Sequence, residues 1–284
     1  MITNLLRRSS WASLLLVLLL SSAPHAYPAS GQKEPPVRAA RAQPETASQA
    51  EARAILMKMA QFLGATQNFR VGVRSGYDAE QPSGQKIEFG EYRTVTLSRP
   101  DRMRVETERS DGAKTLVVLT GKEIVLVDLA SKVYATAPQP GALDQSIVYF
   151  VKDLGMRLPL AALLLNRLPE ELQTRVGSVD YVEKTSIYGT ASHHLAARTD
   201  TVDFQVWVAD GDKPLLQRIV LTYKKAVGQP QFWADFIDWN LAPQLNDATF
   251  SAQVPEGLQK VAFAAQLPRA SHTARQSSAK KGAK

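Results

Sequence analysis

The chain has 284 residues, of which 44% are hydrophobic and 21% are charged, a composition typical of a soluble globular protein with one large or two ordinary domains. The ends carry the whole formal net charge of +7, because the residues from 31 to 268 contain as many acids as bases. A neutral body lacks the basic face that nucleic acid requires, so the composition argues against a nucleic-acid partner.

Residues 1–29 have the three parts of an export signal. Arg7 and Arg8 form a basic start, an apolar run from Trp11 to Leu20 follows, and small residues surround Ala26. The run has about half of the roughly 20 apolar residues needed to cross a bilayer, so we expect a cleaved signal peptide and a periplasmic protein. The chain has no cysteine, which excludes disulfides, thiolate metal sites and a lipidated cysteine.

Residues 30–46 are rich in Pro, Ala and charge, which predicts a flexible linker. A helix is predicted next, with Ser48 as N-cap and Glu51 completing a capping box, and with an end near Gly64 to Gln67. One apolar stripe recurs at helical spacing and predicts the face that packs on the core: Ile55, Met59, Phe62, Leu63 and Thr66.

Alternating apolar and polar residues from Asn68 to Thr136 predict five or six consecutive strands. One of them runs from Glu123 to Asp128. The connections, such as Asp111-Gly112, are only a few residues long, so consecutive strands are expected to be antiparallel neighbours. No helix interrupts this run, which argues against a parallel sheet with a nucleotide crevice.

The segment of residues 146–172 is different, because it is mostly apolar and lacks strand alternation. It predicts two short helices, one ending near Gly155 and one starting after Pro159. Helices this apolar either belong to an ordinary core or cover an apolar cavity. Lys152, Asp153 and Arg157 interrupt the run and argue against a membrane span.

Strands resume after Gly177, and residues 193–225 predict a long hairpin with its turn at Asp210-Gly211-Asp212. In its first strand Val202, Phe204, Val206 and Val208 share one face, and Asp203, Gln205 and Trp207 share the other. The next strand, Phe232 to Leu241, places Trp233, Asp235, Ile237 and Trp239 on one face and Phe232, Ala234 and Phe236 on the other. Apolar bulk on both faces favours a strongly curved sheet with an apolar interior.

The end of the chain predicts a last strand or short turn between Ala248 and Phe263, bent at Pro255-Glu256-Gly257. Residues 267–284 are basic and small, and we expect them to form a disordered tail. Residues 47–266 are therefore expected to form a single folded domain.

The sequence resembles a family of periplasmic domains of unknown function within the superfamily of the outer-membrane lipoprotein carrier LolA. The resemblance covers roughly Glu51 to Phe263 and rests on the pattern Asp203-x-Gln205-x-Trp207, on the Asp-x-Pro that follows, and on Gly228-Gln229-Pro230. It implies an α+β fold: a strongly curved antiparallel sheet, an unclosed β-barrel, with helices covering an apolar interior that can hold acyl chains. No lipoprotein-handling motif matches residue by residue, so the carrier's own cargo is not implied.

These features together predict an exported, non-enzymatic protein that binds or carries a lipid or another hydrophobic ligand in an apolar cavity, with no cofactor and no metal. Envelope proteins or the membrane surface are further candidate partners. The residues expected to line the cavity are Phe150, Leu154, Met156, Leu160, Leu164, Phe204, Val206, Trp207, Trp233, Phe236 and Trp239.

Two other functions stay open at this point. One is an envelope interaction scaffold whose interior is filled by its own side chains. The other is a hydrolase that uses His193 or His194 with Asp203. Neighbouring residues of a strand point to opposite faces, so the two histidines are not expected to bind one metal ion together.

Overall fold

The computed structural model describes residues 45–263 and residue 266. The signal peptide expected at residues 1–29, nearly all of the linker expected at residues 30–46 and the tail expected at residues 267–284 lie outside these described residues.

Six antiparallel strands form a first meander, as the alternation predicted. They are β1 (Asn68–Glu80), β2 (Lys86–Ser98), β3 (Arg102–Arg109), β4 (Lys114–Thr120), β5 (Glu123–Asp128) and β6 (Val133–Pro138). Each strand pairs with the next through a short connection. β1 and β2 are paired over their whole length, from Asn68 opposite Ser98 to Glu80 opposite Lys86.

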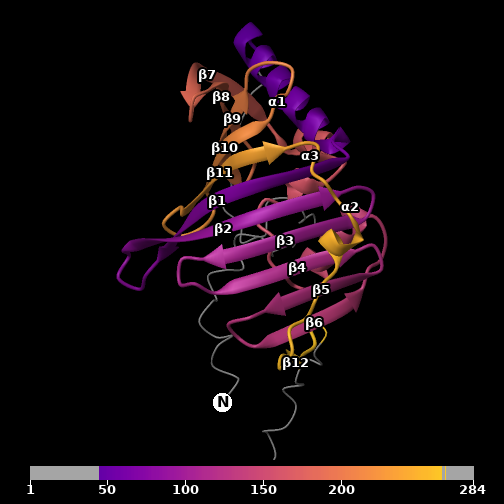
Figure 1. The fold of residues 1–284 in the computed structure, drawn as a ribbon. Helices are drawn as coiled ribbons and strands as arrows, with labels where there is room; N and C mark the ends of the chain where they lie inside the picture. The colour runs from indigo at the N-terminus through magenta and orange to yellow at the C-terminus, as the bar shows by residue number, and fades with distance from the viewer. Residues whose placement is uncertain (1–44, 264–265, 267–284) are drawn as a thin grey trace, which may run out of the picture.

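Five further strands form a second meander: β7 (Ser178–Ile187), β8 (Thr190–Arg198), β9 (Val202–Ala209), β10 (Leu216–Tyr223) and β11 (Gln231–Asn240). β11 pairs antiparallel with β1 and so joins the two meanders, while the short β12 (Gln259–Lys260) pairs parallel with β6. The result is one 12-stranded sheet that runs from β12 to β7 and does not close on itself. The strongly curved, unclosed antiparallel sheet expected from the sequence is thereby confirmed (Figure 1).

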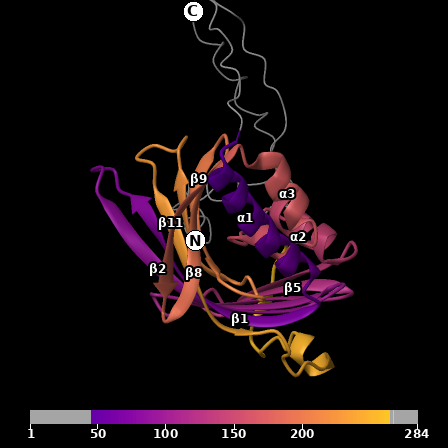
Figure 2. The ribbon, with the colours of Figure 1, turned by 90° about the horizontal axis from the view of Figure 1, so that it is seen from above.

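Helices α1, α2 and α3 lie in the hollow of this curved sheet (Figure 2). Helix α1 (Ala47–Ala65) precedes the sheet, and α2 (Leu143–Lys152), the 3₁₀ helix η4 (Ala161–Leu164) and α3 (Leu168–Arg175) connect the two meanders. A second 3₁₀ helix, η5 (Asp247–Phe250), lies between β11 and β12. Within the described ranges, no helix combines the length and apolar character needed to cross a membrane.

The segment after Pro159 departs from expectation. Only the four-residue η4 forms there, and the next α-helix, α3, begins later, at Leu168, with Pro169 in its first turn. Leu160 has a φ of 61°, which is incompatible with a right-handed helix and explains why no α-helix starts at Pro159.

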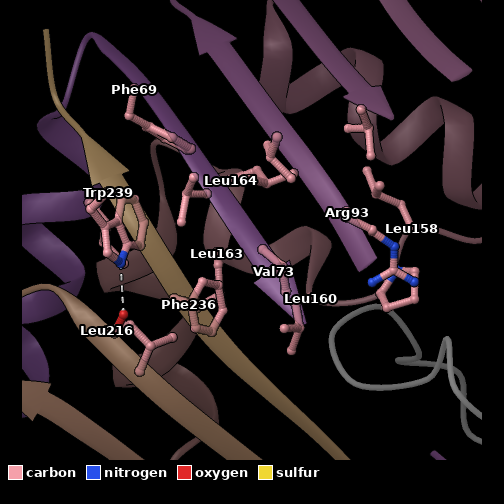
Figure 3. A pocket seen from close by; sticks show the side chains of 15 residues that line it. Phe69, Val73, Arg93, Leu158, Leu160, Leu163, Leu164, Leu216, Phe236 and Trp239 are labelled. Carbon is pink, nitrogen blue, oxygen red and sulfur yellow. Dashed lines mark hydrogen bonds between the residues drawn. The ribbon is translucent and has the colours of Figure 1, made fainter. Parts of the chain in front are cut away.

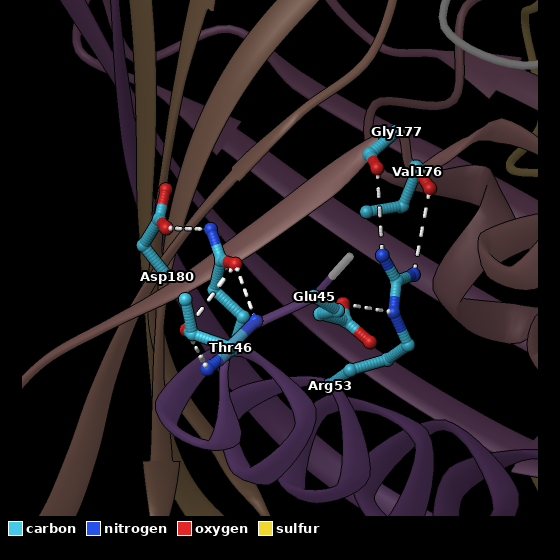
Figure 4. Close-up of polar contacts among 7 residues, drawn as sticks. Glu45, Thr46, Arg53, Val176, Gly177 and Asp180 are labelled. Carbon is cyan, nitrogen blue, oxygen red and sulfur yellow. Dashed lines mark hydrogen bonds and ion pairs between the residues drawn. The ribbon is translucent and has the colours of Figure 1, made fainter. Parts of the chain in front are cut away.

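Helix α1 also begins earlier than expected. Thr46, and not Ser48, is the N-cap, because its hydroxyl accepts from the Gln49 amide while the Gln49 side chain accepts from the Thr46 amide. Further along the helix, Arg53 donates to the carbonyls of Val176 and Gly177 (3.5 and 3.4 Å), which ties α1 to the start of β7 (Figure 4). The buried face of α1 also differs in part from the predicted stripe, because Ile55 and Phe62 are only half-buried and Thr66 is the C-cap. The buried residues of the helix are Ala52, Leu56, Met59, Ala60, Leu63 and Gly64.

Arg99, at the end of β2, joins three segments. Its guanidinium donates to the carbonyls of Thr66 (3.0 Å), Leu63 (3.4 Å) and Leu164 (3.1 Å) and to the side-chain oxygen of Asn166. Leu63 lies in the last turn of α1, where carbonyls have no helical partner. Arg99 therefore fastens both α1 and the segment around η4 to the sheet.

Gly64 allows the same two segments to touch. A Cβ at this position would lie 2.6 Å from the backbone oxygen of Asn166, closer than any side chain tolerates. The end of α1 thus rests directly on the backbone that follows η4, beside the Arg99 guanidinium.

We expect Arg99→Ala to lower the free energy of unfolding by about 3 kcal/mol, because it leaves buried carbonyls without a donor. The free energy of unfolding of Arg99→Lys should lie between those of the wild type and Arg99→Ala, since an ammonium group cannot reproduce the planar donor set. Urea unfolding followed by tryptophan fluorescence measures both. Arg198→Ala is the matched control, because that side chain is 72% exposed; an equal loss in both alanine variants would contradict the anchoring role of Arg99.

Candidate functional site

Two apolar cavities lie between the concave face of the sheet and residues 156–165, which we call the strap. The larger has a volume of about 120 Å³ and lies among α2, α3, the strap and strands β9 to β11. The smaller has a volume of about 40 Å³ and lies among the end of α1, the strap, β1 to β3, β10 and β11 (Figure 3). Four strap residues line both cavities, so the strap is the partition between them: Leu158, Pro159, Leu160 and Leu163.

The walls are almost entirely hydrocarbon. Ile219, Leu221 and Phe232 form the sheet side of the larger cavity, and Phe69, Val71 and Val95 form that of the smaller one. Burial raises the pKa of Tyr223, which also lines the larger cavity, because the phenolate form would be desolvated there. This chemistry suits an apolar ligand.

Five of the residues predicted from the sequence line the cavities. Phe204 contributes to the larger cavity, and Leu164, Phe236 and Trp239 contribute to the smaller one. Leu160 contributes to both. Four others line neither cavity. Phe150, Leu154 and Val206 belong to the hydrophobic core, and Met156 is partly buried and packs against it. Phe150 packs edge-on against Phe263 instead, with ring centroids 6.4 Å apart.

Trp239 reaches the interior through a bulge in β11. Arg70 pairs with Asn240 and Gly72 with Ile237, so β11 holds one extra residue, and Asp238 adopts a φ of 55°. The bulge turns Trp239 onto the face of Phe236, where the two rings stack with centroids 5.9 Å apart. Its indole nitrogen donates to the Leu216 carbonyl (2.9 Å; Figure 3). The expectation that Trp239 shares a face with Trp233 is therefore wrong.

Trp207 and Trp233 lie on the outer face of the sheet, so the expectation that they line the cavity is also wrong. The Arg218 guanidinium lies between them, 5.8 Å from the Trp207 ring centroid and 5.4 Å from that of Trp233. Trp207 also stacks on His194, at 4.1 Å. Gly76 allows Trp233 to lie flat on β1, since a Cβ there would approach the indole nitrogen to 2.7 Å.

Arg93 is a lining residue that the sequence analysis missed. It is buried in β2, it lines the smaller cavity among hydrocarbon side chains, and it forms an ion pair with Glu91. Burial lowers its pKa, and the Glu91 carboxylate acts in the opposite direction. Its position could have been found, because Arg93 continues the inward alternation of Val95 and Leu97.

The residues of the hydrolase alternative are not brought together. His193 lies 3.0 Å from the Tyr181 hydroxyl and 3.1 Å from Asp210, on the other side of the strand from His194. His194 lies 3.0 Å from Gln205. Asp203 forms an ion pair with Lys224 (2.9 Å) and lies 3.9 Å from Arg198. Within the described part of the chain, no three His, Asp or Glu side chains cluster as metal ligands would.

Solved structures of similar fold come from several bacteria. LprF from Mycobacterium bovis is 13% identical, with 74% of this chain and 98% of that chain covered and a TM-score of 0.44. The lipoprotein LppX from Mycobacterium tuberculosis is 10% identical, with 70% and 100% covered and a TM-score of 0.44. A LolA superfamily protein from Nitrosomonas europaea is 12% identical, with 71% and 97% covered and a TM-score of 0.37.

A search of curated proteins found no significant match. A family comparison did find one: residues 52–264 match a family described as "Predicted periplasmic protein (DUF2092)". That description agrees with the export and periplasmic location expected from the sequence. The chain belongs to the DUF2092 family of predicted periplasmic proteins.

Proposed function

We propose that this periplasmic protein is a non-enzymatic binding protein that holds a lipid or another apolar ligand beneath the strap. One observation carries the proposal: Leu158, Pro159, Leu160 and Leu163 separate two apolar cavities, so displacement of this short segment would join them into one chamber. Each buried CH₂ of a ligand contributes about 0.8 kcal/mol. A long alkyl chain therefore binds there without any catalytic group.

Binding requires the strap to move. The cavities of about 120 and 40 Å³ are well below the roughly 300–1,000 Å³ of a typical ligand pocket. The ligand would take the place of the leucine side chains that now fill the centre of the chamber.

The strap is built for such a displacement. Its backbone amides bond locally, Met156 to the Phe150 carbonyl of α2, Ala161 to Leu158 and Leu163 to Leu160, all at 2.9 to 3.0 Å. Leu160 is held at a φ of 61°, a conformation that costs a bulky residue about 1–3 kcal/mol. The middle of the strap is therefore held on the sheet by side-chain packing.

The end of the strap is fixed more firmly. Arg99 donates to the Leu164 carbonyl, and the Asp144 carboxylate accepts from the amides of Asn166 and Arg167 (2.8 and 3.3 Å). The expected motion is thus an outward swing of residues 156–163 about this fixed end.

Purified protein should carry bound lipid, because an apolar chamber in a periplasmic protein would take up lipid from the nearest membrane. Native mass spectrometry and organic extraction detect such a lipid, and the neutral probe N-phenyl-1-naphthylamine should gain fluorescence saturably on binding. A protein that carries no lipid and gives no saturable fluorescence would contradict the proposal.

A second candidate is an envelope interaction module whose interior is filled by its own side chains. The small volume of the two cavities favours it. The two functions differ in one observable: a filled module unfolds cooperatively but takes up no probe, whereas the binding protein takes up the probe while remaining folded.

Ile219→Trp should weaken binding of the naphthylamine probe at least tenfold, because Ile219 forms the sheet side of the larger cavity and the added ring fills it. The matched control is Val220→Trp, in the same strand but on the opposite face, where Val220 pairs with Trp233. The control should leave the probe affinity within about twofold of the wild type. Equal affinities for all three proteins would place the probe outside this cavity.

A further inference from the structure

A polar patch continues the wall of the smaller cavity. On the concave face of β1, Val71 and Val73 line the cavity and the next inward residue is Ser75. On β2 the inward row runs from Val95 to Arg93 and Glu91, and the register sets Ser75 directly opposite Glu91. Arg93 belongs to the cavity wall and to the polar patch, because it lines the cavity and is the first polar residue of this row (Figure 3).

The patch is buried at Ser75 and Arg93, and its charged groups sum to a net positive charge. Arg93 is 6% exposed and is paired with Glu91, whose side chain is 12% exposed. Arg157, an exposed residue of the strap, directly precedes Leu158, which lines the cavity together with Arg93. Partial desolvation lowers the pKa of Arg157, and the nearby Tyr77 and Glu91 act in the opposite direction. Arg93 and Arg157 together carry two positive charges, and Glu91 carries one negative charge.

The buried hydroxyl of Ser75 is a second, independent indication that a ligand binds here. Its side chain is 1% exposed, and within residues 45–263 its hydroxyl has no hydrogen-bond partner. Buried hydroxyl groups are nearly always bonded, because leaving one unpaired is unfavourable. This hydroxyl lies on the face of the sheet that the cavity occupies, next to the Arg93–Glu91 pair.

We infer that the patch formed by Ser75, Glu91, Arg93 and Arg157 binds the anionic head group, a carboxylate or a phosphate, of an amphiphile whose alkyl chain occupies the cavity beneath the strap. The inference rests on the proposed function and deepens it, since it names the class of ligand. Guanidinium groups bind both anions through paired charge-assisted hydrogen bonds, and the Ser75 hydroxyl donates one more. Glu91 holds the Arg93 guanidinium in place.

The head group can be tested with two ligands that share a twelve-carbon chain. Laurate and dodecanol displace N-phenyl-1-naphthylamine from the purified full-length protein, and the experiment compares their displacement constants at pH 8, where the carboxylate is ionised. Wild-type protein should bind laurate at least tenfold more tightly than dodecanol, because one charge-assisted interaction of this kind is worth about a factor of ten.

Arg157→Gln should remove most of this preference and leave dodecanol binding within about twofold. Ser75→Ala should reduce it about threefold. Arg93 is a poor first choice, because its loss leaves the Glu91 carboxylate buried and unpaired. Lys152→Gln, an exposed cation at the end of α2, is the matched control and should retain the full preference.

The possible outcomes separate the two proposals. Equal affinity of the wild type for laurate and dodecanol overturns the head-group inference and leaves apolar binding intact, whereas no binding of the probe or of either ligand overturns both. Acetate and inorganic phosphate, which have the head-group chemistry without a chain, should not stabilise the protein against heat at millimolar concentration. Stabilisation by them equal to that by laurate would identify a small-anion site instead and overturn the inference.

Discussion

The hydrogen bonds of Arg99 hold the concave side of this protein together. The strands satisfy one another through their ladders, but α1 and the strap rest on the sheet mainly through apolar contacts, which have no fixed direction. Arg99 adds direction, because it bonds to carbonyls of both segments at the point where Gly64 lets them touch. The strap is therefore fixed at one end and held only by packing in its middle. The same arrangement leaves the two cavities on either side of the strap.

Much of the fold could be predicted from the sequence because strand alternation is local information. The meander from β1 to β6, the bounds of β5 and the curved, unclosed sheet with helices in its hollow are confirmed. The pairing of β1 with β11 was not predicted, since it depends on contacts between residues far apart in the chain. The prediction of a helix directly after Pro159 was wrong, because Leu160 adopts a left-handed conformation that a right-handed helix does not allow.

The candidate site was only partly predictable. Phe204 and Phe236 were expected to line the cavity as aromatic residues of these strands, and they do. Trp207 and Trp233 were expected there for the same reason but lie on the outer face. The alternation already set Trp207 opposite Phe204, so that signal was available. Trp239 faces inward only because of the bulge at Asp238, which period-two alternation cannot anticipate.

The junction between β1 and β11 also bears on how the chain acquires its fold after export. The first six strands can pair while the rest of the polypeptide is still crossing the membrane, but one side of β1 stays without a neighbour until β11 arrives, when Tyr77 meets Phe232 and Arg70 meets Asn240. Contacts between such distant segments form slowly, and an unpaired strand edge invites association with other chains. This edge of β1 is therefore exposed in the newly translocated chain until the eleventh strand pairs with it.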